Sequence, residues 1–128
     1  MQDEPTEAEL LNAVVAFLRD EIAPQVSGAA AFKLRVATNA IGLVVRQLEL
    51  SEPRAAGELA RLVELLGESG SLLDLNRKLA DSIAAGTLDL NTPGLADHLW
   101  QTTMDKLAVD QPNYASYRRE LERDKERS

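Results

Sequence analysis

The residues of this chain that could do chemistry are few, and they do not form a catalytic set. His98 is the only histidine, and there is no cysteine. A catalytic histidine needs a nucleophile and an orienting group beside it, whereas the notable residue one helical turn from His98 is Thr102. His98 is expected on the polar side of its helix, exposed or at the boundary of the core. We therefore predict no catalytic residue and a protein that is not an enzyme.

A metal site is not predicted either. Asp97 directly precedes His98, and adjacent helical residues point in different directions. A di-metal site in a helical bundle needs a Glu three residues before a histidine, and no acidic residue stands three or four positions before His98. Without cysteine, iron–sulfur clusters and cysteine-ligated zinc are excluded. We expect no metal and no cofactor.

Five polar residues stand among apolar neighbours on expected helices. Asn39 lies in a strongly apolar segment between Arg35 and Arg46, Asn76 lies among leucines, and Lys106 borders an apolar face. A buried polar group without a partner costs about 1–3 kcal/mol. Two interpretations remain open: a buried polar network that fixes helix register, or a pocket for a small anionic ligand.

The network interpretation makes expectations that a structure can check. Asn39 should be buried and hydrogen-bonded, with Asn76 as one partner among others. Arg35 should meet a carboxylate, and Glu21 is the first candidate. For Lys106 we favour a buried stem with a solvated ammonium group.

These residues must be positioned by helices, and the most apolar helix is expected over residues 29–50. Its sequence from residue 31, AFKLRVATNAIGLVVRQLEL, is apolar on most sides when wound as a helix, which is typical of the interior of a bundle. A preceding helix is expected from Glu7 to Ala23. Thr6 and Glu9 form its capping box, its apolar stripe contains Leu10, Val14, Phe17 and Leu18, and Pro24 ends it.

The expected helices after residue 50 begin near Ser51, Ser71, Pro93 and Pro112. The first of them takes Pro53 in its first turn, where proline has no intrahelical hydrogen bond to lose, and ends at Gly67 or Gly70. No segment alternates as a strand does. The predicted fold class is all-α, a single-domain bundle of five or six helices over residues 1–128, with 1–5 and 122–128 frayed or disordered.

Composition limits the classes of partner. The formal net charge is −7, which argues against nucleic acid and against anionic membrane surfaces. No run of 18 or more apolar residues is present to span a bilayer, and the acidic start of the chain lacks the basic region of a signal peptide. We predict a cytoplasmic protein with no nucleic-acid or membrane partner.

Three segments of the chain carry a resemblance: FKLRVATNAIGLVVRQLE at 32–49, SLLDLNRKLADSIAAGTLD at 71–89 and DKLAVDQPNYASY at 105–117. They resemble a small bacterial family of uncharacterised all-helical proteins, a domain of unknown function. The resemblance implies genes near those of kinase-like phosphotransferases and acyl-CoA dehydrogenases, and it carries no established activity. It would highlight Phe32, Arg35, Asn39, Asn76, Lys106, Asp110 and Pro112.

The leading functional prediction is a non-enzymatic accessory or protein-interaction module, with a protein partner or a second copy of the chain. The resemblance implies a clustered phosphotransferase or acyl-CoA dehydrogenase as the enzyme it serves. Trp100, Tyr114 and Tyr117 are either part of a partner surface or the closure of one end of the core. The alternative is a binding protein for a small anionic metabolite such as a CoA thioester, held by Arg35, Asn39, Arg46, Asn76 and Lys106.

Overall fold

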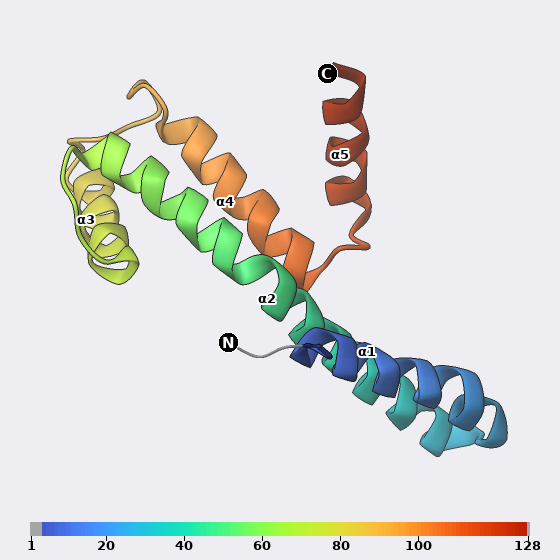
Figure 1. Ribbon diagram of the computed structural model, residues 1–128. Helices are drawn as coiled ribbons and strands as arrows, with labels where there is room; N and C mark the ends of the chain where they lie inside the picture. The colour runs from blue at the N-terminus through green and yellow to red at the C-terminus, as the bar shows by residue number, and fades with distance from the viewer. Residues whose placement is uncertain (1–3, 128) are drawn as a thin grey trace. The chain divides into compact units, whose positions relative to one another are not determined.

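The computed structural model describes residues 4–127, and every regular element in that range is helical (Figure 1). The all-α fold class predicted from the sequence is confirmed. The chain divides into two compact units, the N-terminal unit within residues 1–51 and the C-terminal unit within residues 52–128. Parts of the two expected frayed ends, residues 1–3 and 128, lie outside the described residues.

The N-terminal unit contains two helical segments that run antiparallel. Helix α1 (Glu7–Phe17) begins where the Thr6 hydroxyl accepts the Glu9 N–H at 3.2 Å, as the capping box predicts. The chain continues through a π-helical turn, η1 (Leu18–Ile22), and a 3-10 turn, η2 (Ala23–Gln25). Pro24 lies in that last turn and cannot donate the hydrogen bond that would prolong a helix. The first part of α2 then returns beside α1 (Figure 1).

Helix α2 (Gly28–Leu66) is one helix of 39 residues, so the prediction of two helices that meet near Ser51 is wrong. Pro53 stands inside it, where it removes one backbone hydrogen bond. The next residues, RAAGELA at 54–60, include strong helix formers that let the helix continue past this gap. The division between the two compact units falls between Ser51 and Glu52, one residue before Pro53.

The N-terminal unit covers only one side of its apolar helices. Val45 is its one side chain in the core, at 5 % exposure, among the described residues. Leu10, Val14 and Phe17 of the α1 stripe, which were expected to face inward, are exposed instead, because a pair of helices can cover each helix on one side only. The exposed large apolar side chains of this unit are Leu10, Val14, Phe17, Phe32, Val36, Val44 and Leu48.

Helix α2 is long and apolar enough, by length and composition alone, to cross a membrane. An 18-residue window with at most two charged residues has a mean hydropathy of 1.3, and 6 % of it is buried. Core helices of soluble proteins meet the same criterion, but they are mostly buried. The low burial thus indicates an apolar surface that nothing within residues 4–127 covers.

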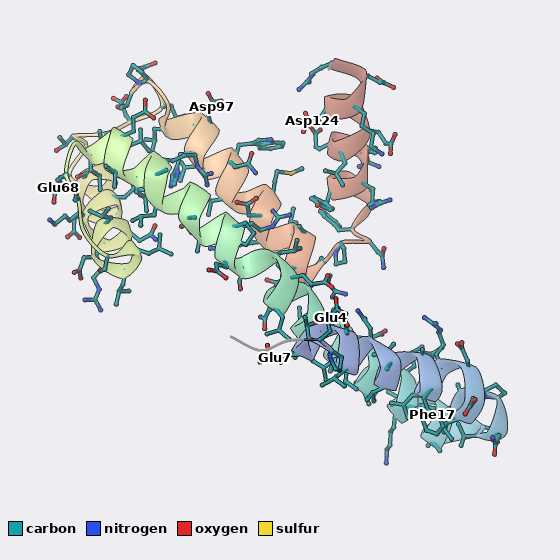
Figure 2. The ribbon with its side chains drawn as sticks, viewed as in Figure 1. Glu4, Glu7, Phe17, Glu68, Asp97 and Asp124 are labelled. Carbon is teal, nitrogen blue, oxygen red and sulfur yellow. The ribbon has the colours of Figure 1, made fainter. Side chains whose placement is uncertain are left out.

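The C-terminal unit joins the second part of α2 to three shorter helices: α3 (Leu72–Ala84), α4 (Leu95–Asp110) and α5 (Ala115–Arg127). Helix α2 ends at Leu66, and the next residue, Gly67, has a φ of 68° that suits glycine. The Ser71 hydroxyl caps α3 by accepting the Asp74 N–H at 3.1 Å, and the sequence predicted a helix that begins near this residue. Asp124 of α5, labelled in Figure 2, lines a cavity together with Tyr117 of the same helix and Trp100 of α4.

A leucine cluster holds α2, α3 and the start of α4 together. Its buried members are Leu62, Leu75, Leu79 and Leu95, and six partly buried apolar residues pack on them. Burial of one leucine contributes about 1.5–3 kcal/mol, so this cluster is the main source of stability in the unit. It also sets the spacing between α2 and α4, the two helices that carry the site described next.

Candidate functional site

The polar interior of the C-terminal unit lies between α2 and α4. Residues at i, i+4 and i+7 share one face of a helix, and both helices place polar residues at this spacing. The two polar stripes are joined by hydrogen bonds and ion pairs. They consist of Arg54, Glu58 and Arg61 on α2, and of His98, Thr102 and Asp105 on α4.

Arg61 contacts all three polar residues of the α4 stripe. Its Nε donates to Nδ1 of His98 at 3.0 Å, and its Nη2 donates to the Thr102 hydroxyl at 3.4 Å. The same Nη2 lies 3.9 Å from Oδ2 of Asp105. A planar guanidinium with several fixed donors is well suited to hold three groups at once. Arg61 therefore fixes the register of α4 on α2.

Asp105 balances the charge of this arrangement. Its Oδ1 accepts from Nη1 of Arg54 at 2.5 Å and from Nε2 of Gln101 at 2.8 Å. Its side chain is 15 % exposed, so solvent screens these contacts only partly. One carboxylate between two arginines makes Asp105 the electrostatic centre of the stripe.

His98 is 2 % exposed, so the expectation of an exposed or boundary histidine is wrong. The side of α4 that carries His98 is polar because it packs against Arg61. Polar residues recur with the same helical period whether they face a polar side chain or water, so the sequence could not distinguish the two cases. Burial lowers the pKa of His98, the Arg61 charge lowers it further, and Glu58 opposes the change. The ring is therefore neutral near pH 7. Because Nδ1 accepts a hydrogen bond from Arg61, the ring proton is on Nε2.

Among the predicted site residues, Asn76 has the surroundings that best fit the interpretation of a buried polar network. It is half-buried, and its amide donates to Oε1 of Glu58 at 3.2 Å and to the Leu72 carbonyl at 3.1 Å. Both partners belong to the C-terminal unit. Asn76 thus links α3 to the α2 stripe, and its partner is a carboxylate where the sequence suggested a second asparagine.

The other predicted site residues are placed differently. Asn39 is exposed, so the prediction that it is buried is wrong. Arg35 is exposed with its guanidinium carbon 5.8 Å from the centre of the Phe32 ring, and no ion pair within residues 4–127 involves it. Both residues lie on the side of α2 that α1 leaves uncovered. Arg46 is half-buried and has an interaction partner, and Lys106 is exposed.

The five predicted residues fall in both compact units, with Asn76 and Lys106 in the C-terminal unit. None of the six stripe residues was among the five predicted site residues, although their i, i+4, i+7 spacing is visible in the sequence. This signal is weak, because charged residues at helical spacing are more often a solvated face. Only the contact between α2 and α4 identifies these two faces as internal.

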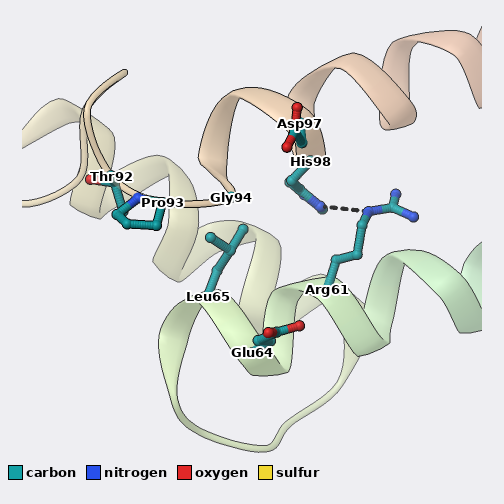
Figure 3. A pocket seen from close by; sticks show the side chains of 8 residues that line it. All are labelled: Arg61, Glu64, Leu65, Thr92, Pro93, Gly94, Asp97 and His98. Carbon is teal, nitrogen blue, oxygen red and sulfur yellow. Dashed lines mark hydrogen bonds between the residues drawn. The ribbon is translucent and has the colours of Figure 1, made fainter.

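A cavity of about 550 Å³ opens beside this network, between α2 and the turn that leads into α4 (Figure 3). Arg61, Glu64 and Leu65 line it from α2, and His98 lines it from α4. Gly94 has a φ of 87°, and a Cβ there would lie 3.4 Å from Cδ2 of Leu65. The remaining lining residues are Thr92, Pro93 and Asp97.

The side chains that line the cavity can bind a ligand through hydrogen bonds and charge. Nε2 of the neutral His98 is a donor, and the Glu64 and Asp97 carboxylates are acceptors. Within the described residues no three side chains of His, Cys, Asp or Glu are grouped as a metal site requires. No lining residue is a cysteine or lysine nucleophile, so we interpret the cavity as a binding site.

The fold and site together define an all-α protein whose helices are joined by an internal Arg–His–Asp network. The family model for Domain of unknown function (DUF6285) matches residues 24–114. Because this match covers more than half of the chain, the protein belongs to that family. The matched region includes α2, α3, α4 and every residue of the two polar stripes. No curated protein and no solved structure matches the chain.

Proposed function

We propose that this protein is a non-enzymatic interaction module that pairs with a second copy of itself through its N-terminal unit. The observation that carries the proposal is the uncovered apolar surface of α1 and the first part of α2, with seven large apolar side chains exposed. Large apolar side chains exposed together on one pair of helices are typical of an association site. Two such helix pairs packed together form a four-helix bundle that covers it.

Charge complementarity favours a second copy as the occupant. The chain from α1 to η1 carries four acidic residues and one basic residue, whereas residues 28–48 carry Lys33, Arg35 and Arg46 with no acidic residue. In a two-fold symmetric pair the same surface meets itself. Helix α1 of one copy then lies on the basic first part of α2 of the other.

The paired protein would serve as an accessory to an enzyme in the cytoplasm. The resemblance described above implies a phosphotransferase or an acyl-CoA dehydrogenase as that enzyme. Pairing presents two C-terminal units to it. Co-purification of the enzyme with the full chain supports this part of the proposal, and a pull-down from the native host that contains neither enzyme overturns it.

The self-pairing is tested by light scattering on the full chain across a range of protein concentrations. We expect twice the monomer mass of 14.0 kDa. The double variant Val14→Glu, Val36→Glu should be a helical monomer, because it places charges on the apolar surface. The matched control is Leu73→Glu, which adds a charge at an exposed leucine of α3 and should leave the dimer intact.

Three outcomes contradict self-pairing. One is a wild-type monomer at every concentration. A second is a double variant that stays dimeric while Leu73→Glu dissociates. A third is binding of the wild type, and not of the double variant, to neutral phosphatidylcholine vesicles, because the apolar surface would then meet a lipid bilayer.

A further inference from the structure

We propose that the cavity between α2 and the start of α4 binds a small primary amine that also carries a hydrogen-bond acceptor. The site lies wholly in the C-terminal unit, whereas the surface proposed for pairing belongs to the N-terminal unit. Three features carry the inference: an unused donor on a buried histidine, two unpaired carboxylates, and a cavity of suitable size.

The unused donor is Nε2–H of His98. The Nδ1 atom is occupied by Arg61, and Nε2 has no hydrogen-bond partner within residues 4–127. No fully buried side-chain nitrogen of the described residues lacks a partner, so Nε2 is partly accessible, and the cavity is an open space that His98 lines. A rigid, buried donor at a cavity wall is a group that orients a ligand.

The two carboxylates determine the charge of the ligand. Glu64 and Asp97 line the cavity and are exposed, and neither has an ion-pair partner in the described part of the chain. Arg61 is already engaged by His98, Thr102 and Asp105. The remaining charge at the cavity is therefore negative and attracts a cation.

The combination selects an organic ammonium compound. Two carboxylates without a third ligand are a poor site for a transition metal, and the described residues contain no larger group. A ligand whose ammonium faces Glu64 or Asp97 can turn an oxygen toward Nε2 of His98. Leu65 and Pro93 contact its carbon chain. The cavity of about 550 Å³ is within the usual range of ligand sites, roughly 300–1,000 Å³.

The test uses ethanolamine as the probe and nitrogen-15 NMR of the full chain. Ethanolamine has both required groups, propylamine lacks the acceptor, and ethylene glycol lacks the ammonium. We expect ethanolamine to shift the His98 Nε2 resonance in a saturable way and propylamine to shift it far less. Ethylene glycol should have no effect.

Variants separate binding from non-specific attraction. Glu64→Gln and Asp97→Asn should each weaken ethanolamine binding about two- to fivefold, as expected for loss of one exposed charge interaction. The control Asp81→Asn removes an exposed carboxylate of α3 outside the cavity and should change nothing. Equal weakening by all three variants overturns the site. So does an unshifted His98 resonance at saturating ethanolamine concentrations, with the fold intact by circular dichroism.

Discussion

At the scale of single residues, His98 shows how an interior can hold a titratable group in its neutral form. The group is 2 % exposed and bonded to a cation, and both conditions oppose protonation. The pKa of His98 in the folded protein is therefore lower than its ordinary value of 6.5. In the unfolded chain His98 recovers that ordinary value.

This difference predicts how stability depends on pH. Between the lowered pKa and pH 6.5 the unfolded chain binds more protons than the folded one, so stability falls as pH falls through that window. Well above pH 6.5 the His98 ring is neutral in both states and contributes no pH dependence. Urea unfolding at several pH values checks this, and His98→Gln should flatten the curve in that window. If the pH dependence of stability in this window is unchanged in His98→Gln, then groups other than His98 cause it.

Asp105 is the second residue that we expect to matter. Asp105→Asn removes the negative charge between Arg54 and Arg61 and should destabilise the protein by ~2 kcal/mol. That is below the 3–5 kcal/mol of a fully buried pair, because the arginines are partly solvated. Asp124→Asn, at an exposed ion pair with Arg127, should cost less than about 0.5 kcal/mol. Thermal or chemical unfolding distinguishes the two, and equal losses would contradict the internal network.

At the scale of elements, Pro53 is the feature that the sequence and the structure interpret differently. Proline signals a helix start when it follows residues such as Ser51 and Glu52, and the spacing predicted two helices. The structure has one helix with a missing hydrogen bond. Helix propensity near Pro53 cannot decide between one continuous helix and two separate helices, because the outcome depends on how the turns on either side of Pro53 pack.

Pro53→Ala tests which description holds. If α2 is continuous, alanine restores the hydrogen bond to the Glu49 carbonyl and should stabilise the protein by about 1–3 kcal/mol, measured by chemical denaturation. Ala56→Pro, three residues later in the same helix, should destabilise it by ~3 kcal/mol. A destabilised Pro53→Ala variant would show that the chain needs a break there.

At the scale of the whole molecule, association should make stability depend on protein concentration. A ligand that binds only the folded state adds about 2.7 kcal/mol at a hundredfold excess over its dissociation constant, and a second copy acts in the same way. The unfolding midpoint of the wild type should therefore rise with concentration. The midpoint of Val14→Glu, Val36→Glu should not, and a parallel rise in that variant would place the association elsewhere.

The sequence by itself determined the local features of this protein. Hydrophobic periodicity, the caps at Thr6 and Ser71 and the glycine at 67 located the helices, because these signals act within a few residues. The apolar character of residues 31–50 was equally clear. Their burial was not, because burial depends on how many neighbours a helix has.

Only the tertiary structure decided which polar faces are internal. It buried His98 against Arg61, linked Asn76 to Glu58 and left Asn39 exposed. A polar face directed at solvent and one directed at another helix have the same period and composition. The contact between α2 and α4 distinguishes them, because hydrogen bonds and ion pairs between residues about 40 positions apart form only when the two helices pack together.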